Sequence, residues 1–278
     1  MSNMYVRAED NSKLEKLVEN SKLTRDQEFK DPSTAGRALR DYVMYGKKSP
    51  FLRRSTLKDV KKMTSKFLID QAKEAMQYEV DIFYTGTINE VAVIDQIKNR
   101  LSISKNLKDS KSPITMDYKK HTRNKVFLID DPKAVQSQIY IMGQGRVLDM
   151  EQRSTSDVFN KYFGSGMASI IFQEIREFRS LAYTAYGAYV NRPEMELPGY
   201  FIGYMGTQVD KSMEAISTYM DLFKNMPIKE NRIPTIKSGL KQSINTRKPG
   251  WRSQGAYVSN AIKQGYDKDP NILDYNNY

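Results

Sequence analysis

The residues best placed to do chemistry lie in one stretch, FQEIREFRSLAYTAYGAY, which runs from Phe172 to Tyr189. Its first half has the apolar spacing of an amphipathic helix, and its second half alternates small and aromatic residues as a strand does. Arg176 and Tyr183 are seven residues apart across this predicted corner. The guanidinium and the phenol can therefore point from neighbouring elements toward one spot. An exposed helix arginine and a tyrosine packed on a sheet are the simpler alternative, because the spacing alone supports both.

Other kinds of active site find little support in the residue types. The chain has one histidine, His121, and no cysteine. Neither an H-x-x-E-H helix nor its inverse can therefore be written, and no catalytic zinc is expected from this chain alone. A Ser-His-Asp triad and a cysteine nucleophile are not expected either. His121 has polar neighbours, and we expect it to be a solvated linker residue.

The close carboxylate pairs and the glycines have structural interpretations. Asp130 with Asp131 fits a turn, and Glu174 with Glu177 fits a helix surface, so neither pair is expected to do acid-base chemistry. The stretch YFGSGMAS lacks the Lys-Ser/Thr ending of a phosphate loop. Its glycines are instead expected to turn the chain into a helix that begins near Met167.

The elements that must position Arg176 and Tyr183 fall into two parts. The first part is mainly helical, with one long helix predicted over Thr56–Gln77, capped by Ser55 or Thr56. A strand is predicted over Tyr78–Thr87, and a helix capped by Asn89 follows it. That strand has no preceding partner, so we expect its partners later in the chain or in sequence that is absent.

The second part alternates strands with helices. The predicted strands are Val126–Ile129, Val135–Met142, Tyr183–Arg192 and Gly199–Gln208; two short helices broken at FGSG lie between the second and third strands, and helices follow from Asp210. Tyr183, Ala185, Gly187 and Tyr189 would share one face, and the aromatic face of this strand is expected mainly in the core. These patterns predict an α+β fold, with a mainly antiparallel sheet covered by helices on one face.

The chain of 278 residues is basic, with a formal charge of +11, and 39% of its residues are hydrophobic. That hydrophobic content is enough for real cores. Much of the basic excess lies in residues 104–125, which we interpret as a solvated linker. Binding of an anion or a nucleic acid is the weaker alternative. The sequence shows no apolar run that could cross a bilayer and no secretory pattern at its start, and it leaves the compartment open.

From about Lys125 onward the chain resembles the insulinase/pitrilysin family of zinc metallopeptidases, specifically its non-zinc domains of C-terminal type. DDPKAVQSQIYI resembles the strand pair that opens a module, YFGSGMASIIFQEIREFRSLAYTAYGAY its glycine turn, helix and R-E-x-x-x-L-A-Y corner, and PGYFIGYMGTQVDK the strand and helix start that follow. Upstream, ALRDYVMYGKKSPF and EVDIFYTGTINEVAVIDQI are similar to the closing half of a preceding module.

This resemblance implies one partial module followed by a second, nearly complete one. Residues 1–104 would be the closing half of the first module, residues 105–124 a basic linker, and residues 125–278 a C-terminal-type module that is truncated at its end. It also implies roles for two residues. Tyr183 would donate a hydrogen bond to the scissile carbonyl as this becomes an oxyanion, and Arg176 would hold the peptide backbone.

The same resemblance implies the partners. The Zn²⁺ would be bound by a zinc-bearing half, covalently joined or separate, and this chain alone would be inactive. A peptide substrate is expected, its backbone pairing with edge strands, and nucleic acid is not. One departure concerns Ser180, since the residue before Leu181 is often glycine in such corners. A non-catalytic partner or scaffold protein of the same fold stays open as the alternative.

Overall fold

The computed structural model describes residues 11–28, 30–100, 106–109 and 116–278. The chain divides into two compact units, Met1–Phe127 and Leu128–Tyr278. The second unit contains a three-stranded antiparallel sheet with helices packed on one face, so the predicted α+β class is confirmed. The division into modules at 1–104, 105–124 and 125–278 stays a prediction.

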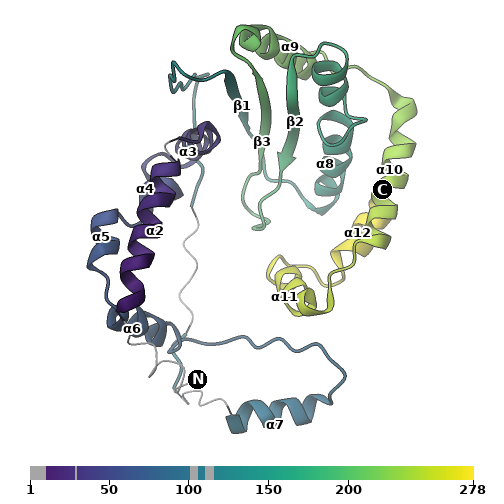
Figure 1. Ribbon diagram of the computed structural model, residues 1–278. Coiled ribbons are helices and arrows are strands. Elements are labelled where there is room, and N and C mark those ends of the chain that lie inside the picture. Colours follow the sequence, from purple (N-terminus) through teal and green to yellow (C-terminus); the bar gives the residue numbers. More distant parts are fainter. Residues whose placement is uncertain (1–10, 29, 101–105, 110–115) are drawn as a thin grey trace. The chain divides into compact units, whose positions relative to one another are not determined.

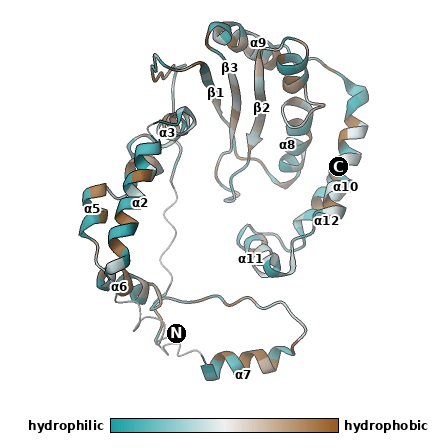
Figure 2. Cartoon of the chain, viewed as in Figure 1, coloured by the Kyte–Doolittle hydropathy of each residue, from teal (hydrophilic) through white to brown (hydrophobic). Residues whose placement is uncertain are grey.

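The described part of the first unit is helical (Figure 1). Its helices are α2 (Ser12–Glu28), α3 (Pro32–Tyr45), η1 (Gly46–Lys48), α4 (Pro50–Arg53), α5 (Leu57–Lys62), α6 (Ser65–Ala75) and α7 (Glu90–Arg100). The Asn89 side chain accepts a hydrogen bond from Val91 N–H (2.9 Å), which confirms the predicted cap of α7. Figure 2 shows apolar bands along α7, where Val91 and Ile94 are exposed.

The long helix predicted over Thr56–Gln77 is wrong, because two helices occupy this range. Thr56 caps α5 as predicted, in a capping box with Asp59. Met63 then adopts an extended conformation, and the Thr64 side chain accepts a hydrogen bond from Phe67 N–H. Threonine competes for backbone donors in this way, so a new helix begins where the apolar spacing suggested continuity.

The strand predicted over Tyr78–Thr87 is also wrong. Only Tyr78 is bridged, in parallel to Lys108, and the following residues form no described strand. Apolar side chains in this stretch stay exposed, for example 54% of Val80 and 53% of Phe83. The apolar alternation is that of a strand, but a strand needs a partner, and the described residues supply none.

Most described residues of the predicted linker, 104–125, are exposed, but two of them contact α3. Lys119 N–H donates to the Met44 carbonyl (2.6 Å) at the end of α3. His121 is half-buried, with Nε2 3.0 Å from the Val43 carbonyl oxygen and its ring 5.9 Å from the Phe127 ring. His121 is therefore a packed residue of the first unit, and the prediction that it is solvated was wrong.

The sheet of the second unit has the order β1-β3-β2, with β1 (Gln136–Gln144), β2 (Ala182–Val190) and β3 (Tyr200–Gln208). These three strands confirm the predictions for the same sequences. The strand predicted over Val126–Ile129 is absent, and Val126 is 95% exposed. The turn before β1 does form, since Ala134 N–H donates to the Asp131 carbonyl (2.9 Å).

The core lies between the sheet and the helices α8 (Met150–Phe163), η2 (Phe172–Glu177) and α9 (Ser212–Lys224) (Figure 1). Its fully buried side chains include Phe163, Ile175, Met205 and Tyr219. The Tyr219 hydroxyl reaches the backbone of the sheet and donates to the Tyr186 carbonyl (3.0 Å). This packing holds η2 and β2 against one another, and so fixes the corner between them.

Two glycines let α8 approach β2 closely. Gly187 N–H donates to the Gly164 carbonyl (3.3 Å), and a Cβ at Gly164 would lie 2.1 Å from the Gly187 oxygen. Gly166 has φ +92°, a conformation that glycine adopts without strain. The predicted tight turn is present, although the helix after it begins at Ile170 and not near Met167.

The rest of the second unit is helical. It consists of η3 (Val209–Lys211), α9, η4 (Glu230–Arg232), α10 (Ile233–Thr246), η5 (Trp251–Ser253), α11 (Gln254–Lys263) and α12 (Pro270–Asn277). The end of α12 contacts α8, where Ser154 donates to Asp274 (2.8 Å) and Tyr278 donates to Asp157 (2.8 Å).

Candidate functional site

Arg176 and Tyr183 meet at the corner between η2 and β2. The Arg176 guanidinium carbon lies 4.9 Å from the centre of the Tyr183 ring and 4.7 Å from that of the Phe172 ring. Tyr183 is 78% exposed, and 38% of the Arg176 side chain is exposed. The structure thus brings together the two side chains that the sequence singled out, and leaves the Tyr183 ring accessible to solvent.

The helix that carries Arg176 is a π-helix over Phe172–Glu177. Phe178 N–H donates to the Gln173 carbonyl (2.9 Å), five residues back, and Leu181 N–H donates to the Ile175 carbonyl (2.9 Å). The π register is rare, and short π segments are frequent at functional sites. Here the wider turn is anchored by Ile175, which is fully buried.

Ser180 is the residue that ends this helix in a left-handed conformation, with φ +49°. Its N–H donates to the Arg176 carbonyl (3.2 Å). The turn therefore keeps the left-handed geometry that glycine would adopt easily, at a cost of roughly 1–2 kcal/mol for a residue with a Cβ. Among the described residues, Ser180 is the only non-glycine residue with a positive φ.

A β-bulge lies at the start of β2, between Ala182 and Thr184. Ala182 pairs with Thr207 and Thr184 with Gly206, so Tyr183 is the extra residue. Tyr183 and Thr184 are both exposed, whereas strict alternation would have put Tyr183 on the buried face with Ala185. The bulge is thus what turns Tyr183 outward, whereas Ala185 and Gly187 of the predicted face are buried and Tyr189 is half-buried.

The charged neighbours of the corner form ion pairs with one another. Glu177 Oε1 lies 3.5 Å from Arg176 Nε, and Glu174 pairs with Arg179. Arg179 also donates to the Glu174 carbonyl (3.0 Å). Glu174, Glu177 and Arg179 therefore support the surface of the corner, and only the Nε of Arg176 takes part in its ion pair.

Sequence reasoning missed Phe172, whose ring packs on the Arg176 guanidinium on the helix side. The signal was available, because Phe172 precedes Arg176 by four residues and such residues are neighbours on a helix. Stacking between two aromatic rings limits the rotamers that the arginine can adopt. Arg176 is therefore held in place by the two rings.

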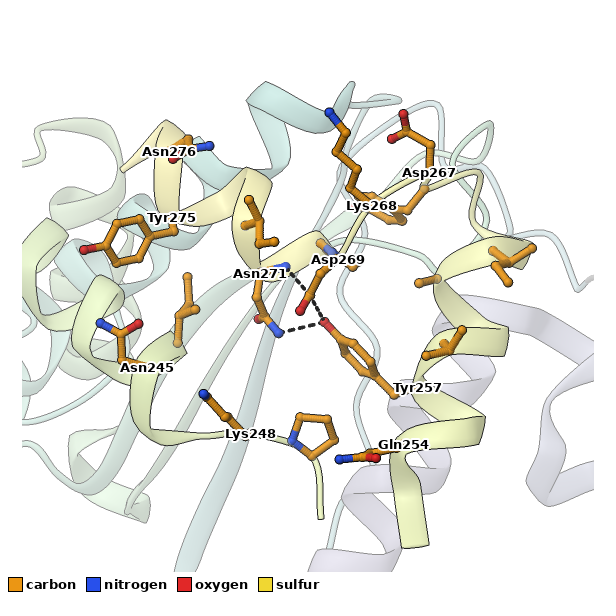
Figure 3. Close-up of a pocket in the computed structure, with 18 residues that line it drawn as sticks. Asn245, Lys248, Gln254, Tyr257, Asp267, Lys268, Asp269, Asn271, Tyr275 and Asn276 are labelled. Atoms are coloured by element: carbon orange, nitrogen blue, oxygen red, sulfur yellow. Dashed lines mark hydrogen bonds between the residues drawn. The ribbon is translucent and has the colours of Figure 1, made fainter. Parts of the chain in front are cut away.

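Apart from the corner, a hollow with a volume of about 790 Å³ lies among α10, α11 and α12 (Figure 3). Tyr257 donates to Asp269 (2.7 Å) and accepts from the Asn271 amide (2.7 Å). Burial, followed by the Asp269 hydrogen bond, raises the pKa of Tyr257 to about 12. The side chains of Tyr257, Asp269 and Asn271 thus bond to one another. None of the residues that line this hollow belongs to the corner of Arg176 and Tyr183.

The described residues contain no group of three or more His, Asp or Glu side chains that would hold a metal ion. The residues of the corner also do not fit a catalytic zinc site, which needs nitrogen or carboxylate ligands around one point. In the described part of the chain, no helix has the length and apolar character needed to cross a membrane.

A family model described as the peptidase M16 inactive domain matches residues 79–240. This range is more than half of the chain and includes Arg176 and Tyr183, so the chain belongs to the M16 peptidase family, the insulinase/pitrilysin family, through its inactive domain. The resemblance seen in the sequence is thereby confirmed. No curated protein matches the sequence.

Solved structures share the fold at low identity. A conserved protein from Enterococcus faecalis V583 is 20% identical with a TM-score of 0.66, and the match covers 94% of this chain and 62% of that one. A peptidase M16 inactive domain from Pseudomonas fluorescens is 15% identical (TM-score 0.64, 96% and 68% covered). The ferredoxin protease FusC, in complex with Arabidopsis ferredoxin, is 10% identical (TM-score 0.70, 94% and 28% covered). The chain thus spans less than two thirds of the Enterococcus protein and of FusC.

Proposed function

We propose that this chain is the substrate-binding, non-zinc half of an M16 metallopeptidase. In this role it holds an extended peptide while a zinc-bearing half, covalently joined or separate, supplies the metal. The observation that carries the proposal is the contact of Arg176 with an exposed Tyr183 at a corner built from a π-helix, a left-handed serine and a β-bulge. Such irregularities cluster where a fold must present a side chain in a particular direction.

The proposed role of Tyr183 is to donate a hydrogen bond to the scissile carbonyl oxygen as negative charge develops on it. A phenol presented from a strand is a fixed donor, and a donor aimed at developing charge lowers the barrier more than it strengthens ground-state binding. The adjacent Arg176 guanidinium adds positive potential at the same place. The exposure of Tyr183 supports this role, because its hydroxyl must reach atoms outside this chain.

The proposed role of Arg176 is to hold the peptide backbone. A guanidinium presents five donors in a rigid plane, and a peptide carbonyl accepts from one or two of them. The rings of Phe172 and Tyr183 restrict the side chain, so less conformational entropy is lost on binding. The metal chemistry, activation of a water by Zn²⁺, belongs in this proposal to the zinc-bearing half.

The test is cleavage of a fluorogenic peptide by this chain mixed with a purified zinc-bearing M16 half. Tyr183→Phe and Arg176→Ala are compared with wild type, and Tyr275→Phe and Arg252→Ala serve as matched controls. Arg252 stacks on the Trp251 ring at 4.1 Å, as Arg176 does on its neighbours, but belongs to another part of the unit. Loss of cleavage in the first two variants only is expected, and equal cleavage by all four contradicts the proposal.

A non-catalytic partner or scaffold protein of the same fold is the second candidate. The observation that favours it is the stacking of Arg176 between two rings, which is a packing contact in its own right. A scaffold role predicts that Arg176→Ala lowers the melting temperature and leaves cleavage by any zinc-bearing half unchanged. The substrate-binding role predicts that Arg176→Ala loses cleavage, so cleavage separates the two roles, and thermal melting checks that the variant is folded.

A further inference from the structure

The face of the sheet opposite the core carries a row of three tyrosines next to the corner. Tyr140, Tyr204 and Tyr186 stand opposite one another in the strand register, one from each strand. The ring centres of Tyr140 and Tyr204 are 5.0 Å apart, and those of Tyr204 and Tyr186 are 5.4 Å apart and stacked. The core residues Ala185 and Met205 are one position away in the same strands and point to the other face.

This face is continuous with the bulge that presents Tyr183. The next row along the sheet joins Gln138, Gly206 and Thr184, and Thr184 directly follows Tyr183. Gly206 has no side chain to fill this row, and the Tyr204 hydroxyl lies 3.4 Å from where its Cβ would be. Beyond the tyrosines, this face therefore carries only the polar side chains of Gln138 and Thr184, beside the Arg176 and Tyr183 pair.

The face is uncharged in a chain that is otherwise rich in charge. All three nine-residue strands lie within the described residues, and none of them contains Asp, Glu, Lys or Arg, although 28% of the whole chain is charged. A charged ligand side chain placed here would lose water without gaining a counter-charge. Tyrosine rings instead offer stacking area together with hydroxyl groups, a combination enriched where proteins bind other chains.

One polar atom on this face has no partner. Gln138 Oε1 is enclosed and accepts no hydrogen bond from the described residues. A buried acceptor without a donor is unfavourable by roughly 1–3 kcal/mol, so a donor brought by a ligand is favoured. A peptide N–H is such a donor, and the half-buried Gln138 side chain would turn toward it within the row adjoining Tyr183.

We infer that the face formed by Tyr186, Tyr204 and Gln138 binds an uncharged segment of an extended peptide, rich in aromatic or aliphatic side chains, beside the Arg176 and Tyr183 pair. This inference deepens the proposed function and rests on it. It adds a preference: the peptide side chains over the tyrosines are apolar, and Asp, Glu, Lys and Arg are disfavoured there. The rings accept apolar side chains by stacking, and Gln138 accepts one backbone N–H.

The test uses two dye-labelled decapeptides and the full chain without a zinc-bearing half, with binding followed by fluorescence anisotropy. One peptide consists of Ala, Gln, Phe and Leu, and in the other Glu and Lys in equal number replace Phe and Leu. The first peptide is expected to bind at least tenfold more tightly. Equal affinity of the two peptides overturns the inference.

The variants locate the binding. Tyr186→Ala is expected to weaken the apolar peptide roughly two- to tenfold, the effect of losing one aromatic contact, and Gln138→Ala to weaken it as well. Tyr186 is on an edge strand and 38% exposed, so its replacement leaves the core in place. Tyr275→Ala is the matched control, with Tyr275 39% exposed on α12. Affinity unchanged by Tyr186→Ala and by Gln138→Ala overturns the inference, as does tyrosine-dependent self-association of the chain in ultracentrifugation.

The two proposals fail separately. Tyr183→Phe keeps the ring and removes only the hydroxyl, so it is expected to leave decapeptide binding within about twofold of wild type. Normal decapeptide binding with unaffected cleavage by Tyr183→Phe would refute the proposed function alone. Loss of cleavage in Tyr183→Phe, with decapeptide binding that ignores Tyr186→Ala and Gln138→Ala, would refute the tyrosine surface alone.

Discussion

At the scale of the residue, the corner depends on side chains in conformations that their sequence neighbours do not predict. The type and spacing of Arg176 and Tyr183 could be read from the sequence, but the spacing alone did not decide between their contact and separate packing of the two side chains. The outward direction of Tyr183 could not be predicted, because one extra residue in β2 reverses the face. Likewise, nothing in the apolar spacing before Arg176 separates a π-helix from an α-helix.

Ser180 gives a prediction about strain. Ser180→Gly is expected to stabilise the chain by about 0.5–1 kcal/mol, because glycine adopts the left-handed conformation without strain but gains entropy on unfolding. Urea unfolding measures the change. Ser238→Gly in the interior of α10 is the control, and it is expected to destabilise by roughly 0.5 kcal/mol. Equal shifts in both variants would mean that Ser180 carries no strain.

At the scale of the element, a strand or helix could be predicted from its apolar pattern where the same unit supplies an element that pairs or packs with it. The strands β2 and β3, both predicted from alternation, pair with each other because a loop of only nine residues joins them. The alternating residues of Tyr78–Thr87 form no strand, since the described residues offer no strand beside them. Thr64 shows the opposite limit, where a local side-chain cap overrides a continuous apolar spacing.

The approach of α8 to β2 gives a second prediction. Gly164→Ala is expected to destabilise the chain by about 3 kcal/mol, because the added Cβ would meet backbone atoms of Gly187 that cannot move aside. Gly239→Ala is the matched control in the interior of α10, where a Cβ meets nothing within 4 Å. This control is expected to stabilise by up to about 1 kcal/mol. Thermal and urea unfolding of both variants check the pair, and a tolerated Gly164→Ala would contradict the packing described.

The contact of α12 with α8 gives a prediction about pH. Burial raises the pKa of Asp157, with Asp274 adding to the effect, while the Tyr278 hydrogen bond and Lys161 oppose it. Burial raises the pKa of Asp274 too, against the Ser154 hydrogen bond. Because both folded-state pKa values lie above the ordinary 3.8, their contribution to stability is complete below that pH and is lost as the pH rises through the folded values.

Asp157→Asn removes one of these charges and keeps an acceptor for the Tyr278 hydroxyl. We expect the variant to equal wild type near pH 4 and to exceed it by no more than about 1 kcal/mol at pH 7, since both groups are partly exposed to solvent. Urea unfolding across this range measures the difference, with the exposed Asp267→Asn as control. A variant that is less stable than wild type at pH 7 would show that the charged form of Asp157 is favoured in the fold.

At the scale of the whole molecule, the chain belongs to the M16 family through its inactive domain, and its described residues contain no group of three or more side chains that would hold a metal ion. The chain has a net charge of +11, but its three described strands contain no charged residue. In the proposed role, the net charge guides encounter over a distance, and the uncharged face selects the peptide segment that lies against it. The net charge could be read from the composition, whereas the alignment of three tyrosines on one face follows only from the strand register.

The central claim is that Tyr183 stabilises an oxyanion in trans to a zinc site. The most direct measurement is the ratio of kcat for Tyr183→Phe and Tyr275→Phe, each mixed with the same saturating zinc-bearing M16 half and one fluorogenic peptide. Removal of an oxyanion donor lowers kcat by roughly 10²–10³ and leaves KM nearly unchanged. We therefore predict a ratio below about 0.01, and a ratio near 1 would contradict the claim.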